Sequence, residues 1–170
     1  MGMIKVTPDV TPRNQQFSTS CWYASLQMLF DWKWRKQRKD EKAEPWKILE
    51  KMDKSKDLYP YYMHDNGISP RECKETAKML GLRWSGDGDF TANILYDMLT
   101  THGPLWVAGM WRRGSSHVIV VTGVDKDSGN IRYIDPWENY SLSDSPGTVS
   151  WLNSRGDTWK NCDASVMYWF

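Results

Sequence analysis

The hydrophobic periodicity of this chain changes at Pro104, and that change limits the folds the chain can adopt. Before Pro104, apolar residues recur at helical spacing in four segments: 21–36, 45–52, 70–80 and 92–101. After it, alternating and β-branched residues predict strands over 105–111, 117–124 and 130–136, with weaker candidates at 147–152 and 165–170. Helices followed by an antiparallel sheet predict an α+β fold.

The length of the chain, 170 residues, fits one domain, because single cores commonly span about 100 to 200 residues. Pro8, Pro12 and a scarcity of apolar residues predict an extended lead-in arm over 1–14 that contributes nothing to the core. Eleven tryptophans supply a large apolar area to the remaining segment. We therefore expect residues 15–170 to form a single domain.

Charge and composition exclude several classes of partner. Lys plus Arg number 22 and Asp plus Glu 21, so the net charge of +1 gives no field for binding nucleic acid. No apolar run approaches the roughly 18 residues that cross a bilayer, and the N-terminus lacks the apolar region of a signal peptide. The three cysteines form no C-x-x-C pair and have no histidine at zinc-ligand spacing, so we expect no metal and no other cofactor.

The three cysteines differ in their expected surroundings. Cys21 falls in the first turn of the predicted helix 21–36, where exposed N–H groups and the helix dipole favour the nucleophilic thiolate. Cys73 falls inside the helix 70–80 and is expected to be a small buried apolar residue. Cys162 lies in a polar segment and is expected to be a surface thiol. Position alone makes Cys21 the reactive candidate.

A thiolate nucleophile needs a proton carrier, and the chain offers His64, His102 and His117. His64 lies in a predicted turn, and His102 is expected to interact with the carbonyl groups that end a helix. His117 begins an apolar strand. A hairpin turn at 125–129 would place Asp135, at the end of the next strand, beside His117.

The string QQFSTSCWYAS, with Gln15 six positions before Cys21-Trp22, resembles the nucleophile segment of papain-like cysteine peptidases. The later segments GPLWV, SSHVIVVTGV and YIDPW are similar to the His and Asp segments of compact bacterial members. Those members include effector proteases of plant-pathogenic bacteria and exporter-associated domains that cut leaders after paired glycines. The similar segments span 15–137, and the resemblance implies a papain-like fold with the nucleophile on the first helix.

The resemblance also implies a role for each residue. Cys21 would attack the scissile carbonyl, His117 would carry the proton, and Asp135 would orient His117. Gln15, with the Cys21 backbone N–H, would form the oxyanion hole; Gln16 is the alternative, because adjacent glutamines leave the register open by one residue.

Two tryptophans are supporting candidates in the same resemblance. Trp22 directly follows the nucleophile. Trp137 lies two residues after Asp135, where it would shield the His–Asp pair from water, and the alternative is that it is one more core tryptophan. Ser18 stands where papain has a disulfide-forming cysteine, and Asp135 replaces the usual Asn; both departures suit the compact bacterial group.

The sequence thus predicts a cysteine endopeptidase that acts as a toxin or effector on a protein substrate in the cytoplasm of a target cell. A separate immunity or inhibitor protein would restrain it in the producing cell. Two alternatives stay open: a transglutaminase, deamidase or acyltransferase that uses the same triad, and a non-catalytic, aromatic-rich binding module. The binding module requires that Cys21, His117 and Asp135 lie out of mutual reach.

Overall fold

The computed structural model describes residues 2–15, 20–39, 44–51, 68, 70–86, 89–112, 115–137, 144–156, 162 and 164–170. In chain order its elements are β1 (Ile4–Lys5), α1 (Cys21–Gln37), α2 (Pro45–Leu49), α4 (Pro70–Leu80), β2 (Arg83–Ser85), α5 (Ala92–His102), β3 (Leu105–Arg112), β4 (Ser115–Val124), β5 (Asn130–Ile134), β6 (Ser145–Thr148), α6 (Val149–Gly156) and β7 (Val166–Tyr168).

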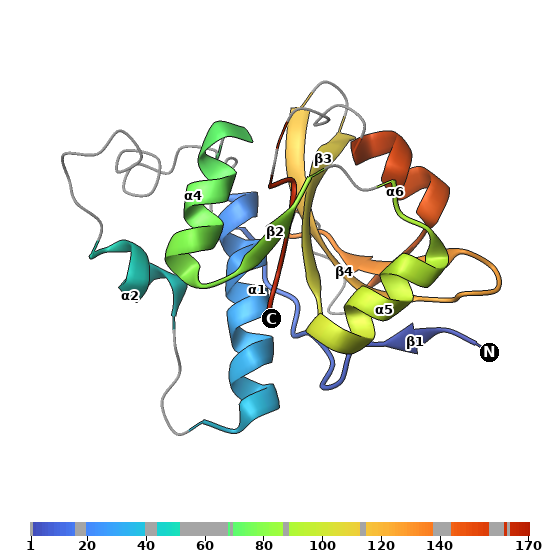
Figure 1. The fold of residues 1–170 in the computed structure, drawn as a ribbon, viewed down its shortest axis with the longest axis horizontal. Helices are drawn as coiled ribbons and strands as arrows, with labels where there is room; N and C mark the ends of the chain where they lie inside the picture. Colours follow the sequence, from blue (N-terminus) through green and yellow to red (C-terminus); the bar gives the residue numbers. More distant parts are fainter. Residues whose placement is uncertain are drawn as a thin grey trace.

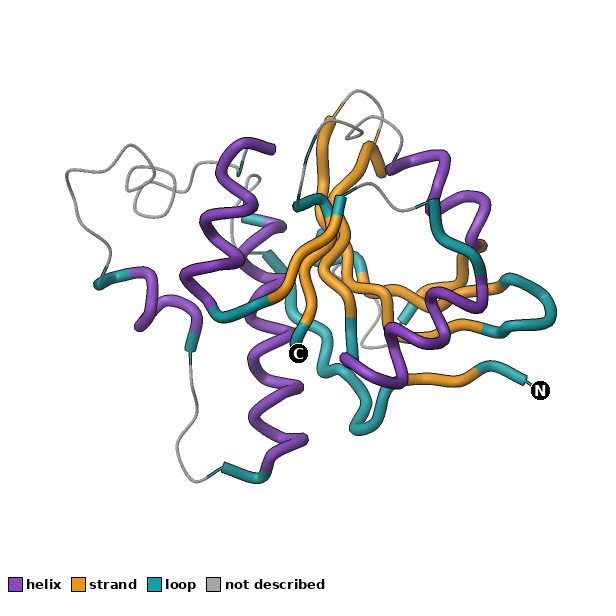
Figure 2. Tube along the Cα trace, in the orientation of Figure 1, coloured by secondary structure: helices purple, strands orange, loops and turns teal. Residues whose placement is uncertain are grey.

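One antiparallel sheet organises the molecule. Its seven strands follow the order β2-β7-β3-β4-β5-β6, and β1 pairs with the end of β4 beyond the part that β3 covers. Helices α1, α2 and α4 lie together on one side of the strands, and α5 and α6 lie on the other (Figure 1). The strands therefore run through the middle of the molecule between two groups of helices (Figure 2), and the predicted α+β class is confirmed.

Helix α1 is the central helix of the core. Ten of its first twelve residues are buried, among them Leu26, Met28 and Leu29, which have no exposed surface. Its last turn carries Arg35 and Lys36, whose positive charges suit the helix C-terminus. Burial on nearly every side fixes α1 against β3 and β4, and it thereby fixes the position of Cys21 at its first turn.

The N-terminal arm, residues 4–15, is packed against both the sheet and α1. Val6 and Val10 are buried in the core, so the prediction that the arm contributes nothing to the core is wrong. Trp32 Nε1 donates a hydrogen bond to the Pro8 carbonyl at 2.8 Å, and Arg35 Nη2 donates to the Asp9 carbonyl at 2.7 Å. These partners lie more than twenty residues away along the chain, which is why the local composition of the arm did not indicate them.

The other predicted elements agree with the structure except at one segment. The helix 70–80, the hairpin of β4 and β5, and a strand within 165–170 are confirmed. The predicted strand 147–152 is wrong beyond Thr148, where α6 begins: the Thr148 hydroxyl accepts the Trp151 N–H at 3.0 Å, as a helix cap does. Among the described residues, no helix combines the length and apolar character needed to cross a bilayer.

Candidate active site

Cys21 occupies the first position of α1, at the end of the helix where backbone N–H groups point outward. Ser20, the N-cap residue, makes no side-chain capping bond among the described residues. Its carbonyl accepts the N–H groups of Tyr23 and Ala24. Cys21 is 9% exposed, so its thiol lies at the edge of the core beside the positive end of the helix dipole.

His117 lies near the start of β4, opposite Gly109 of β3, and Asp135 follows β5 directly. The pairing of Val120 with Ile134 brings Asp135 alongside His117, as a hairpin of this register requires. His117 Nε2 lies 2.6 Å from Asp135 Oδ1. The strand hairpin therefore forms the His–Asp pair from residues 18 positions apart.

The same imidazole lies close enough to the thiol of Cys21 for the two groups to interact, and this interaction raises the pKa of His117. Since Nε2 is held by Asp135, Nδ1 is the ring nitrogen that remains for Cys21. Cys21, His117 and Asp135 are thus brought together from α1, β4 and the residue that follows β5. The binding-module alternative required these side chains to lie apart, and they do not.

The electrostatics of His117 favour its charged form. Burial lowers the pKa of the imidazole, because a charged ring loses solvation. The hydrogen bonds and charge interactions with Asp135 and Cys21 outweigh burial and raise the pKa of His117 to about 9. His117 is therefore protonated at neutral pH, and both ring nitrogens then act as donors.

Gln15 is half-buried, and its backbone N–H donates to the Pro136 carbonyl at 2.9 Å. This bond joins the end of the N-terminal arm to the residue that follows Asp135. Gln15 thus lies on a segment that is tied to the His–Asp pair. Gln16, the alternative donor, lies outside the described residues.

The two tryptophan candidates have different surroundings. Trp22 is buried, and its carbonyl accepts the indole N–H of Trp106 at 3.0 Å, which fixes the first turn of α1 on β3. Trp137 is 41% exposed, so it is not a core tryptophan. Its backbone N–H donates to Asp135 Oδ1 at 2.9 Å, so the oxygen that contacts His117 receives a second bond.

The remaining histidines and cysteines have other surroundings. His102 packs against the ring of Tyr168 with centroids 4.9 Å apart, and His64 lies outside the described residues. Cys73 is fully buried, as predicted. Cys162 is 4% exposed, so the prediction of a surface thiol is wrong; its Sγ–H donates to the Pro70 carbonyl at 3.4 Å.

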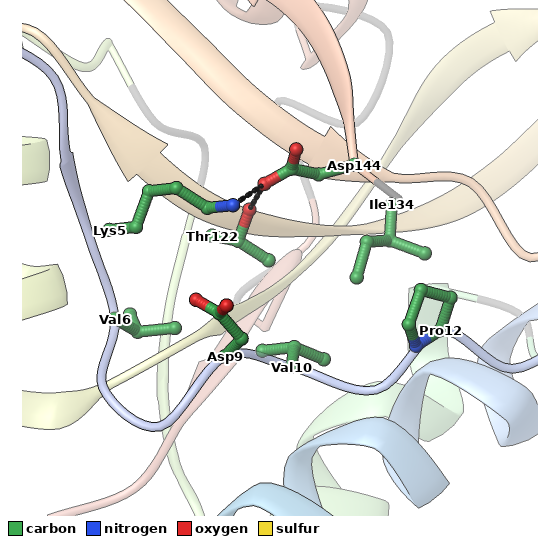
Figure 3. Close-up of a pocket in the computed structure, with 8 residues that line it drawn as sticks. All are labelled: Lys5, Val6, Asp9, Val10, Pro12, Thr122, Ile134 and Asp144. Carbon is green, nitrogen blue, oxygen red and sulfur yellow. Dashed lines mark hydrogen bonds and ion pairs between the residues drawn. The ribbon is translucent and has the colours of Figure 1, made fainter. Parts of the chain in front are cut away.

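The residues that anchor the arm to the sheet were not indicated by the sequence. Lys5 Nζ lies 2.8 Å from Asp144 Oδ2, and the Thr122 hydroxyl donates to the same oxygen at 3.3 Å. Figure 3 shows these three side chains meeting beside a cavity of about 140 Å³ between the arm and the ends of β4 and β5. No local motif marks such contacts, because each joins residues more than twenty positions apart.

A cysteine on the first turn of a buried central helix, facing a histidine and an acidic residue from an antiparallel sheet, defines a papain-like cysteine protease. The model of the family described as papain-like cysteine protease AvrRpt2 matches residues 5–155, and the chain belongs to that family. Its fold is similar to the crystal structure of a protein described as a C39-like peptidase from Bacillus anthracis, with a TM-score of 0.58 and 13% identity, covering 96% of each chain. No curated protein sequence matches the chain.

Proposed function

We propose that Cys21, His117 and Asp135 are the catalytic triad of a cysteine endopeptidase. One observation carries the proposal: His117 Nε2 lies 2.6 Å from Asp135 Oδ1, and the same imidazole interacts with the thiol of Cys21. A nucleophile, a proton carrier and an orienting carboxylate are the three groups that acyl transfer by a thiol requires.

In the first step, the Cys21 sulfur attacks the carbonyl carbon of the scissile peptide bond. The pKa of His117, raised to about 9, favours an imidazolium beside the sulfur, and the N-terminus of α1 favours negative charge on the sulfur. Asp135 holds the ring through Nε2, so that the Nδ1 proton points at Cys21. The proposed attacking form is a thiolate beside an imidazolium.

The attack places negative charge on the carbonyl oxygen, which needs hydrogen-bond donors. The Cys21 backbone N–H, at the open end of α1, is one donor, and the side-chain amide of Gln15 is the other. The bond from the Gln15 N–H to Pro136 keeps the Gln15 backbone beside the triad. A preformed pair of donors stabilises the transition state more than the neutral carbonyl of the substrate.

His117 then donates its Nδ1 proton to the leaving amine, and the peptide bond breaks to leave a thioester on Cys21. A water molecule loses a proton to the neutral imidazole and attacks the thioester, which releases the acid product and leaves the Cys21 thiolate beside the imidazolium. The backbone N–H of Trp137 bonds to Asp135, and the role proposed for its ring is to limit access of water to the His–Asp pair.

We further propose that the protease acts as an effector inside a target cell, on a protein substrate, and that a separate inhibitor protein restrains it where it is made. The resemblance of residues 15–137 to effector proteases of plant-pathogenic bacteria supports this proposal.

The chemistry is tested with a library of fluorogenic peptides and purified wild-type and Cys21→Ala proteins. Wild type is expected to hydrolyse some members of the library, and Cys21→Ala none. Iodoacetamide at mildly acidic pH is expected to alkylate Cys21 before the buried Cys73 and Cys162. Addition of a primary amine distinguishes hydrolysis from acyl transfer, because a transferase would yield the amide product.

The cellular role is tested by mapping new protein N-termini in cells that express wild type or Cys21→Ala. Cleavage products present only with wild type would identify the substrates. Equal toxicity and equal sets of N-termini for the two proteins would refute the proposed effector function.

A further inference from the structure

Two of the three cysteines of this chain, Cys73 and Cys162, lie next to each other. Cys73 lies on α4, one turn after Pro70, and Cys162 lies 89 residues further along the chain. The Cys162 thiol donates to the Pro70 carbonyl at 3.4 Å, which places its sulfur on the face of α4 that carries Cys73. The side chains of Cys73 and Cys162 also lie close enough to interact with one another.

We propose that Cys73 and Cys162 are a site of oxidative cross-linking, at which glutathione disulfide or another low-molecular-weight disulfide converts the two thiols into a disulfide bond. Both residues are buried, at 0% and 4% exposure, so each has the other as its nearest redox partner and solvent is largely excluded. Cys21 lies on α1 with its thiol directed to His117, so it takes no part in the bond. With Cys73 and Cys162 joined, Cys21, the proposed nucleophile, is the one cysteine of the three that stays a thiol.

The reaction is two successive thiol–disulfide exchanges. The sulfur of Cys162 attacks one sulfur of glutathione disulfide, forms a mixed disulfide and releases one glutathione. The sulfur of Cys73 then attacks the Cys162 sulfur, which breaks the bond to glutathione and releases the second. The two protein thiols are oxidised, one glutathione disulfide is reduced, and the two thiol protons pass to the two glutathione molecules.

The surroundings of the pair indicate when this reaction takes place. The hydrogen bond with Cys162, burial and the nearby charge of Glu72 raise the pKa of Cys73, which makes it a poor nucleophile in the folded protein. Burial also keeps a reagent as large as glutathione disulfide from either sulfur. We therefore expect the bond to form mainly while the chain folds, and only slowly in the native protein.

The cross-link would join helix α4 to the segment that leads into β7 of the sheet. α4 belongs to the group of helices that includes α1, whereas Cys162 lies four residues before β7, which lies between β2 and β3. A bond that closes a loop of about 90 residues restricts the unfolded chain strongly. It leaves α1, β4 and β5, which carry the proposed triad, unchanged.

The test uses the full chain as Cys21→Ala, so that only the pair can react. The reduced, unfolded protein is refolded in a mixture of glutathione and glutathione disulfide, and native protein is held in the same mixture for days. We expect a peptide map without reductant to contain the Cys73 and Cys162 peptides joined together, sooner in the refolded sample. The temperature of unfolding should rise by about 5–15 °C relative to the reduced protein, and addition of dithiothreitol should bring it back to the value of the reduced protein.

Cys21→Ala with Cys162→Ala is the matched control and should show no such rise. The proposal is overturned if both samples fold but keep Cys73 and Cys162 as thiols, or carry only mixed disulfides with glutathione. It is also overturned if wild type forms a bond to Cys21 instead. None of these outcomes depends on peptidase activity, so the cross-link and the proposed function are tested separately.

Discussion

Removal of the Asp135 carboxylate should shift the titration of His117 to lower pH. The ordinary pKa of histidine is 6.5, and that of His117 is about 9. This difference corresponds to roughly 3 kcal/mol in favour of the imidazolium, since a change of one in pKa is about 1.4 kcal/mol. Asp135 and Cys21 supply that free energy against the opposing effect of burial.

In Asp135→Ala, burial and Cys21 remain, so we expect the pKa of His117 to fall by at least about one pH unit. Asp135→Asn keeps a hydrogen-bond acceptor without its charge and should give an intermediate value. The raised pKa means that the imidazolium of wild type persists up to about pH 9 and is lost above it. Hydrolysis should therefore decline on the alkaline side near pH 9 in wild type and at lower pH in Asp135→Ala.

The measurement is an NMR titration of protein labelled with ¹³C at histidine Cε1. The chain has three histidines, so His64→Gln and His102→Gln assign the signals. Cys21→Ala serves as the comparison that removes the other partner. If His117 titrates at the same pH in wild type and Asp135→Ala, Asp135 does not raise the pKa of His117.

The same difference in pKa predicts how stability depends on pH. The folded pKa of His117 lies above the unfolded value, so its contribution is fully present below pH 6.5 and is lost as pH rises through about 9. Chemical denaturation across this range should show the free energy of unfolding falling in wild type by up to roughly 3 kcal/mol, and by less in His117→Gln. A wild-type stability that is flat from pH 6.5 to 9 would contradict this.

Four further substitutions follow from contacts and backbone angles described by the structure. Gln15→Ala should lower kcat/KM about 10²- to 10³-fold while iodoacetamide still alkylates Cys21 at the wild-type rate; unchanged kcat/KM would exclude Gln15 as an oxyanion donor. Gly103→Ala should destabilise by about 2–5 kcal/mol, because φ is 87° and a Cβ would lie 2.3 Å from the Trp32 ring. Gly129→Ala, with φ of 73° and open space around the added Cβ, should cost only about 1–2 kcal/mol. Thermal melts of both variants check this, and equal losses of stability in Gly103→Ala and Gly129→Ala would refute the steric argument. Asn153→Ala removes two hydrogen bonds to the Phe90 backbone, of 2.9 and 2.8 Å, and should cost about 1–3 kcal/mol in urea denaturation, whereas no loss would mean that water replaces them.

Local signals were sufficient to predict much of the fold and the candidate triad. A helix that begins at Cys21, and a hairpin whose turn lies at 125–129, are specified by residues close together in the sequence. The hairpin register then determines that His117 and Asp135 meet at the same end. Residues close together in the sequence therefore determine a contact between two residues that are 18 positions apart.

The errors concern residues whose environment is set by distant partners. Helix α6 begins directly after Thr148, and Trp151 in that helix stacks on Tyr133 of β5 with centroids 4.9 Å apart, a contact that the alternating pattern of 147–152 does not reveal. Cys162 has polar neighbours in sequence but is buried against Pro70 of α4. The polarity of neighbouring residues in the sequence is a poor guide to the burial of one side chain that turns toward the core.

The position of β7 has a consequence for how this protein associates with other copies when it opens. β7 lies between β2 and β3, so the edge of β3 that includes Trp106 and Val107 depends on three late residues for its backbone partners. Until β7 is in place, or whenever it detaches, that edge presents unpaired N–H and C=O groups beside apolar side chains, which is the template on which strands from other molecules add. Conditions that release β7 are therefore expected to favour self-association through the exposed edge of β3.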